Sequence, residues 1–237
     1  MRIDKFISEM KVASRKEAAS VAKRGGVLVN GEAVKDLSRH IDPDKDRITY
    51  LGEDISYQKF VFVMLNKPEG YVSATEDRSL PPVTDLLPPE LRARGLFPVG
   101  RLDRDTVGLM ILTNDGEAAH RLLAPKRHVS KKYRFSAAEP LAAGAEELFL
   151  SGVVLRDGYE CKSAELLLDS GRCSGVITLT EGKYHQIKRM IASFGNKVTA
   201  LERIEFAGIG LDPELKRGEW RYLTEDECRE LYRLASL

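Results

Sequence analysis

The sequence predicts an α+β protein of two domains, and three patterns along its 237 residues indicate this class. Apolar residues recur at helical spacing in the first two dozen residues, and an alternating stretch around an Asn-Gly pair follows them. Beyond residue 60, apolar and β-branched runs bounded by glycine or proline predict several strands with short helices between them. A chain of this length can bury a large core in one domain or in two.

The N-terminal segment predicts a small α-β module. An apolar stripe through residues 3–10 indicates one helix, and a capping box that begins at Ser14 indicates a second. The stretch VLVNGEAV alternates around Asn30 and Gly31, which is typical of a hairpin with a type I′ turn. A further strand is expected at 47–51.

This module is basic, although the whole chain is nearly neutral with 37 Lys and Arg against 36 Asp and Glu. Residues 1–39 hold nine basic and five acidic residues. A local surplus of positive charge suits a phosphate-binding surface, while a solvated helix face is the commoner explanation. The cations of the two helices should lie on one side of the module: Arg2, Lys5, Arg15, Lys16, Lys23 and Arg24.

The pattern loosens around residues 54–59, where we place a linker, so the module should span residues 1–56 and a larger domain residues 57–237. The larger domain should be rich in strands. Its expected elements are a buried strand from Lys59 to Pro68, an extended connection at 77–98, strands at 107–113 and from Lys131 onward, further strands within 153–180, and helices at 117–123, 142–149, 187–194 and after Thr224.

Several classes of protein are excluded by simple features. The three cysteines, Cys161, Cys173 and Cys228, are odd in number and far apart, so neither a disulfide framework nor a CxxC metal site is expected. The four histidines are scattered, which argues against a metal. No signal-like N-terminus and no long apolar run is present, so we expect a cytoplasmic protein without a membrane segment.

A compact group of opposite charges stands directly before an apolar run that should be buried. The stretch GRLDRDTVGLMILTNDG, residues 100–116, places Arg101, Asp103, Arg104 and Asp105 together. Such charges could pair at the surface, where ion pairs contribute little. Alternatively, one carboxylate is held beside a pocket. Three other stretches, NKPEGYVS, KKYRF and EGKYHQIKRM, would bring a phenol and several cations to the same cleft.

These stretches resemble the signatures of the pseudouridine synthases, in the branch that includes the small-subunit ribosomal RNA enzyme RsuA. GRLDRDTVGLMILTNDG is similar to the catalytic signature, and MLNKPEGYVSA and EGKYHQIKRMIASFGNKV are similar to two further ones. The segment MRIDKFISEMKVASRKEAASVAKRGGVLVNGEAV resembles the RNA-binding module named after small-subunit ribosomal protein four. The resemblance spans the chain and implies a mixed, mostly antiparallel catalytic sheet after the module.

By this resemblance Asp103 is the catalytic carboxylate, Tyr133 the active-site tyrosine and Lys188 the basic residue that pairs with the carboxylate. Many relatives have arginine in place of this lysine, so bidentate geometry is lost while the charge is kept. Arg101 matches a position that helps to hold or replace the flipped base. Asp105 is the competing carboxylate, and we expect it to be structural.

The implied reaction cuts a uridine from its sugar at nitrogen 1 and rejoins it through carbon 5. It is an isomerisation without net redox change, so no cofactor is expected. The carboxylate can attack the sugar or abstract a sugar proton to form a glycal, and the sequence leaves both routes open. Because the uridine must leave its stack, substrate contacts are expected beside those of the N-terminal cations. They should come from Arg101, Asn66, Lys67, His185 and Arg189.

Plainer explanations stay open on spacing alone. Tyr133 could be a half-buried strand residue, and Lys188 and Arg189 could be the wet side of an amphipathic helix. The chain could also modify large-subunit RNA, or be a non-catalytic RNA-binding assembly protein or a tRNA synthetase fragment. No P-loop accompanies the module, and the C-terminus lacks a long basic tail. We therefore expect a monomeric enzyme whose partner is small-subunit ribosomal RNA or an assembling small subunit.

Overall fold

The computed structural model describes residues 1–10, 12–55 and 59–237. The chain forms two compact units, Met1–Phe60 and Val61–Leu237. Residues 56–58 of the expected linker, and with them the expected boundary after residue 56, lie outside the described residues. The expected start of the linker is wrong, because Asp54 belongs to strand β4 (Glu53–Ile55), which pairs with β3 (Ile48–Tyr50). None of the described helices is long and apolar enough to cross a membrane.

The first unit confirms the helices, the hairpin and the strand that the sequence predicts. Ser14 caps the second helix through a complete capping box with Glu17. Asn30 and Gly31 both have positive φ, 53° and 86°, as a type I′ turn requires. The elements are α1 (Ile3–Glu9), α2 (Arg15–Lys23), β1 (Val27–Val29) and β2 (Glu32–Ala33), and the sheet order is β2-β1-β3-β4.

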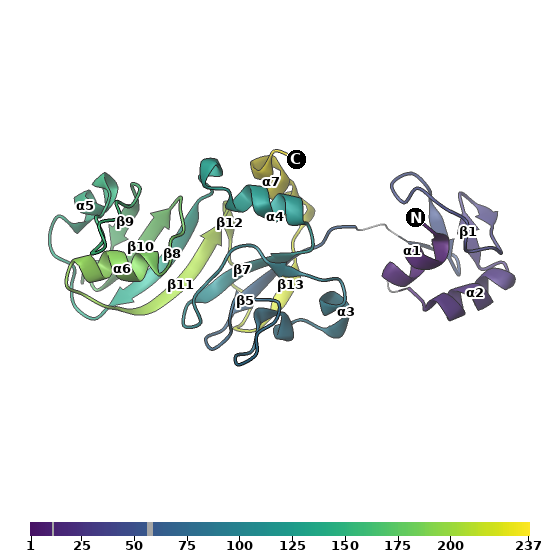
Figure 1. Cartoon of the computed structure of the whole chain (residues 1–237), viewed down its shortest axis with the longest axis horizontal. Coiled ribbons are helices and arrows are strands. Elements are labelled where there is room, and N and C mark those ends of the chain that lie inside the picture. Colours follow the sequence, from purple (N-terminus) through teal and green to yellow (C-terminus); the bar gives the residue numbers. More distant parts are fainter. Residues whose placement is uncertain (11, 56–58) are drawn as a thin grey trace. The chain divides into compact units, whose positions relative to one another are not determined.

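The second unit is built on one large sheet with the order β13-β5-β7-β11-β8-β10-β9 (Figure 1). Two short strands, β6 and β12, pair with β7 and β11. All pairings between the named strands are antiparallel except that of β7 with β11, which confirms a mixed, mostly antiparallel sheet. The strands are β5 (Phe62–Lys67), β6 (Phe97–Pro98), β7 (Val107–Thr113), β8 (Lys131–Ala137), β9 (Glu165–Leu168), β10 (Ser174–Leu179), β11 (Val198–Phe206), β12 (Ile209–Gly210) and β13 (Trp220–Tyr222).

Helices cover both faces of this sheet. Successive residues of a strand point to opposite faces, so one strand contributes to the apolar clusters on both sides. In β7, Met110 and Leu112 join the apolar cluster that contains helices α5 (Ala145–Ser151) and α6 (Gln186–Ser193). Leu109 and Ile111 join a second cluster, under α4 (Gly116–Leu123) and α7 (Glu225–Ala235). The latter two helices pack against each other (Figure 1).

Some expected elements differ from the structure. The connection at 77–98 is not wholly extended, since it contains the 3-10 helix η1 (Val83–Leu86), the short α3 (Pro89–Arg92) and β6. The largest omission is β11, a nine-residue strand in the middle of the sheet. Charged residues interrupt its apolar pattern, and two register shifts against β8 disturb its alternation. Its central place therefore leaves little trace in the sequence.

Candidate active site

The loop that carries Asp103 joins β6 to β7, and a buried lysine anchors its backbone. Lys67, at the end of β5, is fully buried. Its ammonium shares its three protons among the backbone oxygens of Pro68, Asp103, Arg104 and Thr106, which lie 2.8–3.2 Å away. Burial lowers the pKa of Lys67 to about 8, against the opposing effect of nearby carboxylates. The ammonium is therefore still the main form at neutral pH, and it fixes the path of the loop.

The segment after β5 holds the same loop from another direction. Ser73 Oγ accepts a hydrogen bond from Leu102 N at 2.9 Å and donates one to Leu102 O at 2.7 Å. Gly70 N donates to Arg104 O at 2.9 Å. The stretch NKPEGYVS thus contributes by positioning the loop backbone.

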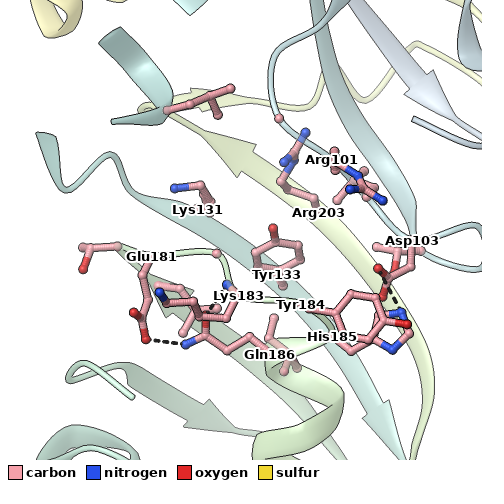
Figure 2. A pocket seen from close by; sticks show the side chains of 18 of the residues that line it. Arg101, Asp103, Lys131, Tyr133, Glu181, Lys183, Tyr184, His185, Gln186 and Arg203 are labelled. Carbon is pink, nitrogen blue, oxygen red and sulfur yellow. Dashed lines mark hydrogen bonds and ion pairs between the residues drawn. The ribbon is translucent and has the colours of Figure 1, made fainter. Parts of the chain in front are cut away.

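Asp103 faces two cationic or ionisable side chains from the start of α6. Lys188 Nζ lies 2.9 Å from one carboxylate oxygen, and His185 Nε2 lies 3.4 Å from the other. The Asp103 side chain is 28% exposed. Its carboxylate is therefore held in one orientation at the wall of a cavity that remains open to a ligand (Figure 2).

Lys188 bridges two carboxylates. Its ammonium also donates to Asp105 at 2.6 Å, and the Asp105 side chain is 61% exposed. Partial burial acts to lower the pKa of Lys188, but its hydrogen bonds and charge interactions with Asp105 and Asp103 outweigh burial and raise that pKa. For Asp105, the ion pair with Lys188 outweighs burial and lowers the pKa. The more enclosed carboxylate, Asp103, faces the cavity, and the other points toward solvent.

The cavity beside Asp103 has a volume of about 550 Å³ and is lined by the sheet and by the loop before α6. Such a volume suits a small ligand such as one nucleotide. Tyr133 of β8 is buried in its middle, with Lys131 two residues earlier on the same side of the strand (Figure 2). Arg203 of β11 pairs directly with Tyr133 in the register of the two strands.

The loop before α6 is held by a buried carboxylate. Glu181 accepts hydrogen bonds from Gln186 Nε2 at 2.6 Å, from Tyr159 Oη at 2.9 Å and from Lys162 N at 3.0 Å. His185 itself has positive φ, 47°. These hydrogen bonds fix the position at which α6 begins. They therefore also fix the direction of the Lys188 side chain, which lies in the first turn of α6.

Tyr184 forms an exposed aromatic platform at the rim of the cavity. Its ring stacks on that of His185 with centroids 3.8 Å apart, and the residue is 73% exposed. An exposed aromatic face beside a pocket is the kind of surface on which an unpaired base stacks.

The structure brings together Asp103, Tyr133, Lys188, His185 and Arg101, which all line the cavity. Two predicted substrate contacts need correction, because both side chains are buried and already bonded within the protein. Asn66 donates to Leu215 O at 2.7 Å and accepts from Arg217, and Lys67 binds the loop backbone as described above.

The remaining predicted contacts lie elsewhere. Arg189 is not among the residues that line the cavity, and its guanidinium pairs with Asp157. In the first unit, Arg2 pairs with Asp4 at 2.8 Å and Lys5 with Glu9 at 3.5 Å. The other four cations are exposed and make no ion pair within the described part of the chain: Arg15, Lys16, Lys23 and Arg24.

Sequence reasoning missed Lys131, Arg203, Tyr184 and Glu181 as members of the site. A signal existed for Lys131, which lies two residues before Tyr133 in a predicted strand and therefore on its face. Tyr184 and Glu181 belong to the stretch EGKYHQIKRM, which was predicted to contribute to the cleft. Their spacing does not show which way their side chains point. Arg203 lies in the strand that was not predicted.

Fold and site together define an enzyme with a nucleotide-sized cavity and a carboxylate held by a lysine. Residues 61–193 match the family model described as RNA pseudouridylate synthase, and residues 1–48 match that of the S4 domain. The chain therefore belongs to the RNA pseudouridine synthase family, with an RNA-binding S4 domain at its N-terminal side. It is an isomerase of that family.

Relatives match over almost the whole chain. "Uncharacterized RNA pseudouridine synthase YtzG" of Bacillus subtilis is 44% identical over 98% of both chains. "Ribosomal small subunit pseudouridine synthase A" of Escherichia coli is 38% identical over 96% of this chain and 98% of its own. A crystal structure described as that of a pseudouridylate synthase is 36% identical, covers 98% of this chain and 99% of its own, and superposes with a TM-score of 0.69.

Proposed function

We propose that the protein converts a specific uridine of small-subunit (16S) ribosomal RNA to pseudouridine, with Asp103 as the catalytic carboxylate. The observation that carries the role of Asp103 is its place at the wall of the cavity, where Lys188 and His185 hold both of its oxygens. The choice of RNA is supported by relatives named for ribosomal small-subunit RNA, which share 36–38% of their residues with this chain.

Asp103 acts on the sugar of the uridine. Its carboxylate either bonds to carbon 1′ as nitrogen 1 of the base leaves, or removes the proton of carbon 2′ so that a glycal forms. Lys188 pairs with this carboxylate at 2.9 Å. The same lysine restricts the carboxylate to one orientation, which lowers the entropic part of the barrier.

Tyr133 provides the surface on which the detached base turns. Its ring is buried in the cavity and lies on the sheet floor, so a flat pyrimidine can stack on it. Its phenol can relay the proton that leaves carbon 5 after the new bond has formed. Arg101, exposed at the same cavity, is placed to hold the flipped nucleotide or to fill its former position in the RNA.

The S4 domain supplies affinity for RNA that does not depend on this chemistry. Its exposed cations attract phosphates, and such contacts offset the few kcal/mol, roughly, that flipping a base costs. We propose that a single chain is sufficient, since one unit contains the whole cavity, and that the enzyme acts in the cytoplasm, where ribosomal subunits assemble.

Mapping of pseudouridine in ribosomal RNA tests the proposal. RNA from cells that lack the enzyme is incubated with wild-type protein, Asp103→Asn or Asp105→Asn, both as naked RNA and as partly assembled particles. We expect one new site in 16S RNA with wild type and with Asp105→Asn, and none with Asp103→Asn. A new site in large-subunit RNA would overturn the substrate, and activity of Asp103→Asn would overturn its role. Tight RNA binding without any modification would support an assembly factor instead.

A further inference from the structure

Arg203 is a buried cation without a counter-ion. The residue is 1% exposed. Its Nε donates to Leu109 O at 2.7 Å, and a second nitrogen contacts the sulfur of Met110 at 3.8 Å. No carboxylate within the described residues lies at ion-pair distance from it, although nineteen other ion pairs are formed there. Burying an unpaired charge is costly, so such an arginine points to a ligand that supplies the missing negative charge.

The position of Arg203 directs it at the substrate cavity. In the antiparallel pair β11 and β8 it stands opposite Tyr133, so the two side chains lie next to each other on one face (Figure 2). On the other side, Gly108 of β7 allows the backbone to approach, since a Cβ there would lie 2.3 Å from Arg203 O. The arginine is thus fixed by β7 and lines the cavity beside the tyrosine ring.

Lys131 adds a second cation, on the face of β8 that also carries Tyr133. Its ammonium donates to Val129 O at 2.8 Å and has two further protons to offer. Burial, together with the charge of Arg203, lowers the pKa of Lys131 to about 8, and Glu181 acts in the opposite direction. That carboxylate is occupied by Gln186 and Tyr159 and forms no ion pair with the lysine. At neutral pH the cavity therefore presents two cations that the described residues leave without an anionic partner.

We propose that Arg203 and Lys131 stabilise the uracil anion that forms when the base leaves its sugar. This inference rests on the proposed function, since it takes the cavity at Asp103 and Tyr133 as the active site. By either route at the sugar, the bond between nitrogen 1 and carbon 1′ breaks and its electron pair stays on uracil. The negative charge is shared by nitrogen 1 and the two carbonyl oxygens. Carbon 5 then bonds to carbon 1′, either as the bond between carbon 1′ and Asp103 breaks or as carbon 2′ of the glycal regains its proton from Asp103. Loss of the carbon 5 proton and protonation of nitrogen 1 complete the isomerisation.

The detached base fits these cations better than an RNA phosphate does. Arg203 is buried and lines the same cavity as Tyr133, so a flat base stacked on that ring would bring a carbonyl oxygen toward the guanidinium. Phosphates are bulky and strongly hydrated, and exposed cations at the rim and in the S4 domain suit them. Donors that are already in place where charge develops contribute strongly to catalysis, because little reorganisation is needed at that moment.

Single-turnover kinetics with saturating enzyme distinguish stabilisation of the uracil anion, which changes the rate, from contact with an RNA phosphate, which changes the Kd for RNA. The variants are Arg203→Met and Lys131→Met, with Arg134→Met as the control because Arg134 is the neighbour of Tyr133 on the opposite, exposed face of β8. We expect the rate to fall about 100-fold or more for Arg203→Met and about tenfold for Lys131→Met. The Kd for RNA should stay within about twofold of wild type in all three. Rates near wild type, or a defect that lies only in Kd as for a phosphate contact, would overturn the proposal.

A change of leaving group tests the same point independently. Fluorine at carbon 5 withdraws electrons, so 5-fluorouracil leaves as a more stable anion and needs less help from the protein. The defect of Arg203→Met should therefore be about tenfold smaller when loss of 5-fluorouridine is followed in RNA that carries it at the target position. An equal defect on both RNAs contradicts the assignment. If Arg203→Met does not fold, Lys131→Met decides by the same two criteria.

Failure of this inference is distinguishable from failure of the proposed function. Asp103→Asn is measured alongside on the same RNA. If that variant is inactive while Arg203→Met and Lys131→Met react like wild type, the active site stands and the anion site falls. If Asp103→Asn is active, the proposed catalytic carboxylate falls first.

Discussion

The S4 domain and the catalytic cavity are both rich in cations, but their cations are placed in opposite ways. In the S4 domain Arg15, Lys16, Lys23 and Arg24 project into solvent and have no ion-pair partner within the described residues. Around the cavity, Lys67 and Arg203 are buried, and each is fixed by backbone oxygens. We propose that the exposed cations serve affinity for RNA, while the enclosed ones serve geometry and reaction.

Electrostatics explains why the two placements cannot replace each other. An exposed lysine attracts phosphates from several ångströms away, but salt screens it and its side chain is free to move. An enclosed cation acts over a short range in a medium of low polarity, where its effect on a reacting group is much larger. Substitutions in one region should therefore change RNA affinity, and those in the other should change rate or stability.

The largest effect is expected from Lys188→Met. It leaves the carboxylates of Asp103 and Asp105 facing one another without the cation that bridges them. We expect the single-turnover rate to fall about 10³-fold at unchanged RNA affinity, whereas Lys188→Arg should stay within about tenfold of wild type. An equal loss in the arginine variant would mean that lysine geometry matters more than charge.

Lys67→Met tests the structural use of an enclosed cation. Four backbone oxygens lose their donor, so we expect the free energy of unfolding to fall by about 3 kcal/mol. Urea unfolding measures this, with the exposed Lys126→Met as the control. Full stability together with weaker RNA binding would restore Lys67 to the substrate contacts from which its burial removed it.

Tyr184→Ala should have an intermediate effect. Tyr184 is exposed, like the cations of the S4 domain, but it belongs to the rim of the cavity. Loss of a stacked base costs about 1–3 kcal/mol, so the Kd for RNA should rise about tenfold, and Tyr184→Phe should bind like wild type. Fluorescence anisotropy with a short RNA provides the measurement. A fall in the saturated rate with unchanged Kd would show instead that Tyr184 acts through His185, on which it stacks.

The smallest effect is expected in the S4 domain. In the double variant Lys16→Ala and Lys23→Ala, the negative slope of log affinity against log salt should become shallower by about two. The rate at saturating enzyme should not change. Titrations at several salt concentrations measure the slope. A changed rate at saturating enzyme would contradict the separation of affinity from reaction between the two regions.

The sequence predicted the site best where a motif and a clear element coincide. Asp103, Tyr133 and Lys188 lie in stretches whose strands or helix were recognisable, and the structure places all three at one cavity. The stretch NKPEGYVS pairs a strand end with polar groups, so the sequence predicted substrate contacts from Asn66 and Lys67, which the structure buries. The loop of Asp103 covers Lys67, while Leu215 and Arg217 of the segment before β13 bind Asn66, and only tertiary structure shows these contacts.

Arg203 illustrates what could not be predicted. Its strand has charged residues among the apolar ones and does not alternate regularly against β8, so local periodicity is weak. The stability of β11 comes from neighbours on both sides, β7 and β8, which are distant in sequence. Long-range pairing of this kind overrides local preference, and single-sequence patterns do not contain it.

The parallel pairing of β7 with β11 also determines when the enzyme becomes competent during synthesis. Asp103 precedes β7, and Tyr133 and Lys188 lie in the chain between β7 and β11. Arg203 of β11 forms the pairing itself, opposite Gly108 of β7. Contacts between distant parts of a chain form late because the intervening loop must first be closed. A nascent chain that has not yet released β11 already contains the whole first unit but lacks the strand that completes the proposed site, so we expect RNA binding to precede the ability to modify RNA.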